Sequence, residues 1–154
     1  MDDNEKPLKI DRSSFQLGMI NCFAEMVACG VKRLALSPPL TPEEYERLKG
    51  ASEDIACGFG IKSYSEKSLL VTDLQSEDFT RGKWSILYFK NDETLEAYLD
   101  LKKEKERLER EGVYDREARR SVSKAFMQLL SYPDDVIEAK LSQDRPKDPY
   151  IHES

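Results

Sequence analysis

Histidine is almost absent from this chain. Its 154 residues include one histidine, His152, close to the C-terminus. Serine and cysteine nucleophiles usually take their activating base from a neighbouring histidine, as in Ser-His-Asp and Cys-His systems. A single histidine in a polar C-terminal segment is a poor candidate for that role. The sequence therefore argues against enzymes of these types, and it identifies no catalytic residue.

Cysteine is also scarce, with three residues and no closely spaced pair. Structural zinc sites need Cys or His ligands a few residues apart, so we predict no metal and no cofactor. An odd number of cysteines indicates reduced thiols and a cytoplasmic location. A sulfur-rich stripe at helical spacing is more typical of core packing than of a soft-metal or haem contact. The stripe comprises Met19, Cys22, Met26 and Cys29.

Long hydrophobic runs and an excess of basic charge are missing as well. No stretch approaches the roughly 18 apolar residues that a membrane span needs. The N-terminal sequence MDDNEKPLK has no apolar signal core. The formal net charge is −6, which argues against a nucleic-acid-binding protein, because such proteins carry a basic surface. We therefore predict a soluble protein with neither a membrane nor a nucleic acid as its partner.

What remains is a charge-rich chain that is long enough to bury a hydrophobic core. We predict a single α+β domain over 13–143, between flexible ends at 1–12 and 144–154. The first helix should start near Ser13 and Ser14, which are good N-cap residues, and stop at Gly30. Apolar side chains cover most of its circumference. Such helices are usually packed on more than one side, so this one should be buried at the centre of the fold.

Short runs bounded by turn residues have strand character. They are 31–37, 59–64, 68–74 and 84–90. The last run is apolar on both faces and should lie inside a sheet rather than at an edge. If the first two strands share a sheet, the helix between them should make them parallel, with a right-handed crossover. We predict a small mixed sheet of about four strands, in the sequence order α-β-α-β-β-β-α-α-α.

The C-terminal half is predicted to be helical. A long charged helix should start at Asn91 or Asp92 and end at Gly112, and a second should start at Asp115. Pro133 can start a third, shorter helix. The short connection between the first two predicts a C-terminal helical hairpin.

The segment SPPLTPEE, residues 37–44, joins a strand to a helix where an anion could bind. Thr41 is the expected N-cap, with Pro42 after it and Glu44 completing a capping box. The prolines lack N–H groups and the glutamates already supply negative charge, so we predict a stiff capped turn rather than a phosphate site. Thr41→Ala should then cost ~0.5–2 kcal/mol of stability. Glu44→Gln should cost less, because glutamine can still close the box.

Ligands favour the carboxyl ends of parallel strands, so polar groups there define a candidate pocket. Ser37 ends the first predicted strand, and Ser63 and Tyr64 end the second. The carboxylates of Glu25 and Asp73 could serve as general acid or base if they are desolvated. The alternative is that they are solvated or ion-paired. The candidate pocket residues are Asn21, Glu25, Ser37, Ser63, Tyr64 and Asp73.

A group of basic residues near the start of the helix after Asp115 is a candidate interaction surface for an acidic partner. Neighbouring glutamates and aspartates can neutralise it, which would make it a solvated, salt-bridged helix pair instead. The group consists of Arg116, Arg119, Arg120 and Lys124.

Two functions fit these observations. The first is a cytoplasmic binding or interaction protein, because no catalytic motif is present and the helix over 91–111 spends many residues on solvated surface. The alternative is a small enzyme or ligand-binding domain that uses carboxylate, Tyr and Lys groups in the candidate pocket. The sequence does not identify the partner, whether protein or small molecule, and it is compatible with self-association.

Overall fold

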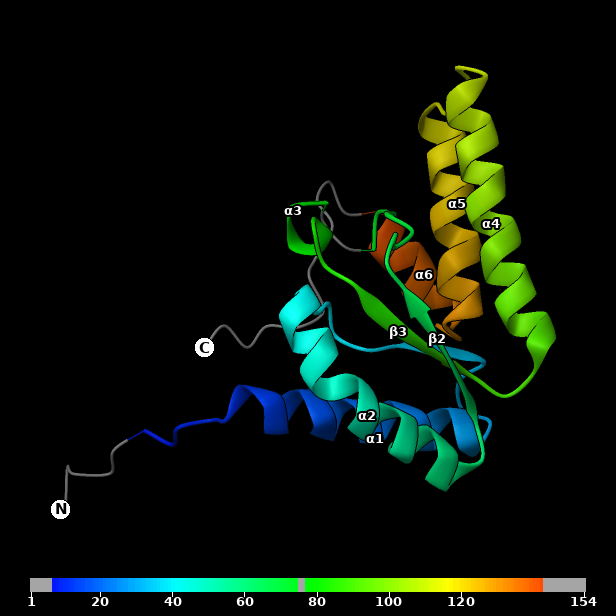
Figure 1. Cartoon of the computed structure of the whole chain (residues 1–154). Helices are drawn as coiled ribbons and strands as arrows, with labels where there is room; N and C mark the ends of the chain where they lie inside the picture. The colour runs from blue at the N-terminus through cyan, green and yellow to red at the C-terminus, as the bar shows by residue number, and fades with distance from the viewer. Residues whose placement is uncertain (1–6, 75–76, 143–154) are drawn as a thin grey trace, which may run out of the picture.

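The computed structural model describes residues 7–74 and 77–142, which are arranged in three layers (Figure 1). Helices α1 and α2 cover one face of a three-stranded sheet, and α4, α5 and α6 cover the other face. The architecture is α+β, as the sequence predicts. The elements of this part of the chain are α1 Arg12–Ala28, β1 Leu34–Leu36, α2 Pro42–Phe59, β2 Lys62–Glu66, α3 Glu77–Thr80, β3 Ser85–Phe89, α4 Asp92–Arg110, α5 Arg116–Leu129 and α6 Asp134–Leu141.

Strand β3 lies at the centre of the sheet, between β1 and β2, and pairs antiparallel with both. Leu34 of β1 and Lys62 of β2 both lie opposite Phe89. Every residue of β3 is buried, which confirms the predicted internal position of this strand. β1 and β2 therefore run parallel to each other, as predicted, but they are not neighbours. The predicted mixed pairing is wrong, because β3 is inserted between them and makes every pair antiparallel.

The predicted strand over 68–74 is absent, so the sheet has three strands rather than four. Backbone N–H groups of this segment bind side chains from the helices instead of a neighbouring strand. The Leu70 N–H donates to the Tyr98 hydroxyl over 3.2 Å, and the Asp73 N–H donates to Ser123 Oγ over 3.0 Å. The apolar pattern correctly predicted that this segment is buried, but it packs against α4 and α5 and not within the sheet.

Alternation along β3 sends its side chains into two separate cores. Ile86 and Tyr88 pack with α1 and α2, and the Tyr88 hydroxyl shares a hydrogen bond of 2.6 Å with Ser52 Oγ of α2. Leu87 and Phe89 pack with α4, α5 and α6. The sequence predicted this assignment of faces, because the run 84–90 is apolar at both its odd and its even positions.

Helix α1 is not the buried central helix that the sequence predicts. One stripe along it faces α2, β1 and β3, and the opposite side is exposed. The prediction was wrong because an apolar circumference shows which side chains can be buried, and not whether a second layer exists to cover them. The buried residues of α1 are Gln16, Ile20, Ala24 and Val27.

The helix ends follow local capping rules. The capping box of Thr41 and Glu44 at the start of α2 is confirmed. At the other end of α2, Gly60 adopts a φ of 70°, a left-handed conformation that favours glycine. α1 is capped by Asp11 rather than by Ser13 or Ser14. The Asp11 carboxylate accepts both the N–H and the hydroxyl of Ser14.

Helices α4 and α5 form the predicted hairpin and lie side by side (Figure 1). Asp115 caps α5, and α6 follows Pro133. No helix within the described ranges is both long and apolar enough to cross a membrane. The segments predicted to be flexible, 1–12 and 144–154, lie largely outside the described residues, although α1 begins within the first of them.

Candidate interaction surface on α1

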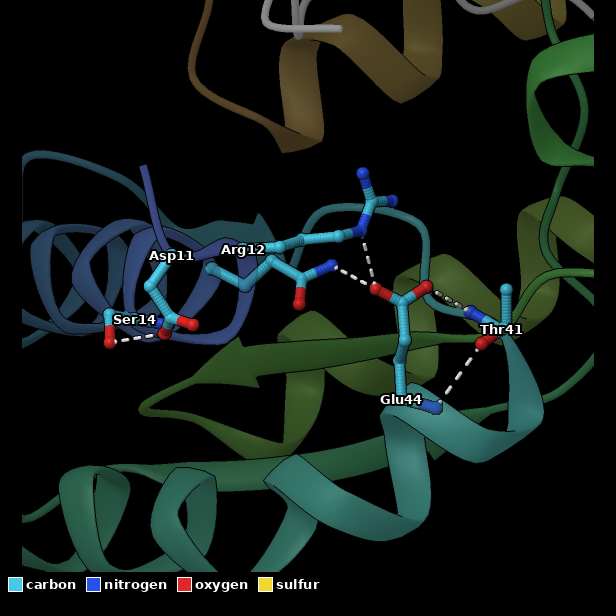
Figure 2. Close-up of polar contacts among 6 residues, drawn as sticks. Asp11, Arg12, Ser14, Thr41 and Glu44 are labelled. Atoms are coloured by element: carbon cyan, nitrogen blue, oxygen red, sulfur yellow. Dashed lines mark hydrogen bonds and ion pairs between the residues drawn. The ribbon is translucent and has the colours of Figure 1, made fainter. Parts of the chain in front are cut away.

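A buried carboxylate, Glu44, joins α1 to the first turn of α2 (Figure 2). Arg12 Nε donates to Glu44 Oε2 over 2.8 Å, and Gln16 Nε2 donates to the same oxygen over 2.6 Å. Glu44 Oε1 accepts the N–H of Thr41 over 3.1 Å. The Glu44 side chain therefore caps α2 and anchors the N-terminal half of α1 at the same time.

The electrostatic state of Glu44 follows from these contacts. Burial opposes its ionisation, because its side chain is 8% exposed. Hydrogen bonds from Arg12, the Thr41 backbone and Gln16 outweigh burial and lower the pKa of Glu44 to about 2. Glu44 is therefore ionised at neutral pH. It acts as a structural anion and is unsuited to the role of a general acid.

The solvent side of α1 carries a line of apolar side chains at alternating spacings of four and three residues. Phe15 and Met26 are 37% and 39% exposed, and Cys22 and Cys29 are both exposed. This is the spacing at which one helix packs along another. We call this surface the α1 seam; its residues are Phe15, Met19, Cys22, Met26 and Cys29.

Most of the large exposed apolar side chains of the described chain lie on α1 or next to it in the sequence. Scattered exposed apolar residues are ordinary on soluble proteins, but a contiguous group marks an interaction site. Among the large exposed apolar residues of the described chain, only Tyr64 and Val113 lie elsewhere in the sequence. The others are Leu8, Ile10, Phe15, Met26 and Val31.

The sulfur-rich stripe was predicted to fill core space, and that prediction is wrong. Cys22, Met26 and Cys29 lie on the exposed side of α1, and Met19 is only partly buried. Its spacing matched a helix face correctly, but the sheet and α2 cover the other face. Within the described residues, no group of three or more His, Cys, Asp or Glu side chains could hold a metal ion.

The predicted pocket residues occupy separate parts of the fold. Asn21 and Glu25 are exposed on α1, and Ser63 and Tyr64 are exposed on β2. Ser63 and Tyr64 point to opposite faces of the sheet, because successive strand residues alternate. The structure therefore does not bring these four side chains to one site.

Ser37 is buried at the end of β1 and stabilises the sheet. Its hydroxyl oxygen accepts the N–H of Ile86 over 2.9 Å and lies 3.2 Å from Ser85 Oγ. Ser85 Oγ in turn donates to the Ser37 carbonyl over 2.9 Å. These bonds continue the pairing of β1 with β3 beyond the strand itself.

The predicted basic surface is mostly neutralised within the fold, but by Asp73 and by Glu138 of α6 rather than by the acidic residues next to it in sequence. Arg119 pairs with Asp73, a residue predicted for the pocket, at 2.6 Å. Glu138 of α6 pairs with Arg120 at 3.2 Å and with Lys124 at 3.7 Å. Arg116, the first residue of α5, is exposed.

Sequence reasoning missed a buried ion pair between β2 and α4. Lys102 Nζ and the Tyr98 hydroxyl both donate to Glu66 Oε2, over 2.9 and 2.7 Å. Burial raises the pKa of Tyr98, and the hydrogen bond to Glu66 raises it further. The polar sequence KSYSE gave no signal that its last residue is buried. The Glu44 contacts with α1 were missed for a similar reason, because only the capping spacing is visible locally.

Comparisons of the chain with protein-family models, with curated proteins and with solved structures give no match. Its function is therefore inferred from the surfaces described above.

Proposed function

We propose that this chain is a binding protein that recognises an amphipathic helix of a partner protein through the α1 seam. The observation that carries the proposal is a heptad-spaced apolar line on the solvent side of a helix whose other side is buried. A partner helix with a matching apolar face would bury this line by helix-to-helix packing. Such burial is the main favourable contribution to protein association.

The shape and composition of the α1 seam support a helix as the partner. From Phe15 to Cys29 the seam extends roughly 21 Å along the helix axis, at about 1.5 Å per residue. It is the convex surface of a helix, whereas small-molecule sites are concave. Methionine side chains are flexible and polarisable, so they adapt to a partner surface.

The anchoring of α1 also supports this proposal. Glu44 holds the N-terminal half of α1 in place through Arg12 and Gln16. A helix that is already ordered loses less conformational entropy on binding. The free, exposed thiols of Cys22, Cys29 and Cys57 are compatible with a reducing, cytoplasmic setting.

The alternative function, a small enzyme or ligand-binding domain, has less support. Ser37 is engaged with Ser85, and Asp73 is paired with Arg119. Glu25 is exposed, so burial does not prepare it for acid or base catalysis.

Thiol reactivity tests the proposal, because Cys22 and Cys29 belong to the α1 seam and Cys57 lies on α2. In a native extract, a bound partner should slow alkylation of Cys22 and Cys29 several-fold relative to the isolated protein. Alkylation of Cys57 should proceed at the same rate in both samples. Mass spectrometry of the alkylated peptides measures all three rates.

Met26→Glu places a charge on the seam between Cys22 and Cys29 and should abolish the protection of both thiols. Val113→Glu is the matched control, because it also replaces an exposed apolar residue but lies between α4 and α5. This control should retain the protection. Equal alkylation rates in extract and isolated protein would contradict the proposal, as would protection that survives Met26→Glu.

A further inference from the structure

Strand β2 forms an exposed edge of the sheet. It lies at one end of the strand order β1-β3-β2, and its first four residues, 62–65, are all exposed. Ser63 lies opposite Tyr88 and shares its face with α2, whereas Tyr64 lies opposite Leu87 and shares its face with α4. Because residues 62–65 are exposed on both faces of the sheet, neither helical layer covers this part of the strand.

The pairing pattern shows which backbone groups of β2 point outward. Ser37, which follows β1, donates its N–H to the carbonyl of Ile86. Ile86 therefore bonds toward β1. In an antiparallel sheet the backbone groups of successive residues point to alternate sides, so Leu87 bonds toward β2. Tyr64 lies opposite Leu87 and therefore bonds inward. The N–H and C=O groups of Ser63 and Ser65 consequently point away from the sheet.

We propose that two copies of this chain join edge to edge through β2, in antiparallel orientation, and form one continuous sheet. With the two-fold axis at Tyr64, Ser63 of each copy lies opposite Ser65 of the other. Each of these two pairs can exchange two backbone hydrogen bonds, which uses all the outward groups of Ser63 and Ser65. This register also overlaps the full length of β2, which registers centred on other residues do not.

The side chains at the centre of the junction fit the same register. At its ends Lys62 of each copy lies opposite Glu66 of the other, but each keeps its partner within its own chain, Asp92 for Lys62 and Lys102 for Glu66. Tyr64, which is 36% exposed, lies opposite its own copy in a close non-hydrogen-bonded pair. Two-fold symmetry supplies the pairing of Ser63 with Ser65 twice, whereas a foreign strand would have to provide the two pairs separately.

A pair of variants at Ser63 tests the proposal. Ser63→Pro removes one outward N–H but leaves the inward bonds of β2 to β3 in place, which is the position where a strand tolerates proline. Ser63→Ala retains the N–H. Analytical ultracentrifugation between roughly 1 µM and 1 mM, the range of weak to moderate dissociation constants, should show dimers for the wild type and Ser63→Ala. Ser63→Pro should stay monomeric and keep the wild-type circular dichroism spectrum.

Amide hydrogen exchange of the wild type provides a second measurement that does not depend on how any variant folds. The amides of Ser63 and Ser65 should exchange more slowly as protein concentration rises, whereas those of α1 should not change. A wild type that stays monomeric, or exchange at Ser63 and Ser65 that is independent of concentration, would overturn the proposal. A dimer that survives Ser63→Pro and is lost in Met26→Glu would also overturn it, and would assign self-association to the α1 seam.

Discussion

The side chain of a single residue, Glu44, connects two helices of this fold. Its carboxylate completes the cap of α2 and also accepts hydrogen bonds from Arg12 and Gln16 of α1. The capping box alone predicts that Glu44→Gln is milder than Thr41→Ala. The structure reverses this order, because the variant loses the negative charge that Arg12 and Gln16 bind.

Glu44→Gln should lower the free energy of unfolding by about 2–3 kcal/mol, which is the scale of the pKa depression at this buried carboxylate. Thr41→Ala should cost less, about 0.5–2 kcal/mol, because it removes one capping oxygen. Urea denaturation at pH 7 compares the two variants. A smaller loss for Glu44→Gln than for Thr41→Ala would show that the joint with α1 contributes little.

The pH dependence of stability offers an independent test of Glu44. Its pKa in the folded protein, about 2, lies below its ordinary value of 4.5, so the unfolded chain takes up a proton first. Its contribution to stability is therefore present above about pH 4.5 and is lost as the pH falls toward 2. The stability difference between wild type and Glu44→Gln should shrink across this window. Denaturation curves collected at intervals between pH 7 and pH 2 would show it, and parallel pH profiles would count against this role.

Among the elements, the segment 67–74 shows how side chains of a helix can substitute for a neighbouring strand. The Tyr98 hydroxyl accepts the Leu70 N–H and donates to Glu66, so it ties this segment and β2 to α4. Lys105 Nζ adds a bond of 3.0 Å to the Val71 carbonyl. Side chains of α4 and α5 thus bind backbone groups of this segment in place of a neighbouring strand.

Tyr98→Phe should destabilise the protein by about 1–3 kcal/mol, because it leaves the buried Leu70 N–H without its acceptor. Hydrogen exchange should accelerate in 67–74 more than in α1 or α2. Tyr132→Phe is the control, since its ring keeps its contact with Lys32, and it should change stability by less than about 0.5 kcal/mol. A uniform acceleration throughout the chain would mean that Tyr98 supports the whole fold rather than this segment.

Elements with strong local signals could be predicted from the sequence. The start of α2 at Thr41, the start of α5 at Asp115 and the central place of β3 follow from capping residues and from alternation. The segment 68–74 could not be assigned, because a buried alternating pattern looks alike whether a strand or a helix covers it. The exposed side of α1 could not be recognised from the sequence either, because apolar residues lie on both the buried and the exposed side of this helix.

The candidate pocket failed for a topological reason. Ser37 and Ser63 would meet at one sheet edge if β1 and β2 were adjacent parallel strands. The insertion of β3 separates them, and no local pattern in the sequence reports strand order. The α1 seam, by contrast, consists of residues whose helical spacing is visible in the sequence. That the sheet and α2 cover the other side of the helix could not be foreseen.

At the scale of the whole molecule, β3 is shared by the two hydrophobic cores. Neither core can lose β3 without exposing the other, so the described part of the chain should unfold in one cooperative transition. Trp84 packs against the core of α1 and α2 and reports on that side. Helical circular dichroism reports on both sides together. The two signals should give coincident urea transitions, and a separate early transition of either signal would show that the layers unfold independently.

The central place of β3 also governs the order of events during synthesis. Leu34 of β1 and Lys62 of β2 share Phe89 as their pairing partner, and that residue is translated after both. A nascent chain that ends at Glu66 has made two strands and two helices, yet none of its strands has a neighbour. Closure of the sheet is a long-range event and is slow relative to the local pairing of α4 with α5. The emerging N-terminal half, with an apolar surface around much of α1, therefore cannot close its sheet until β3 has left the ribosome.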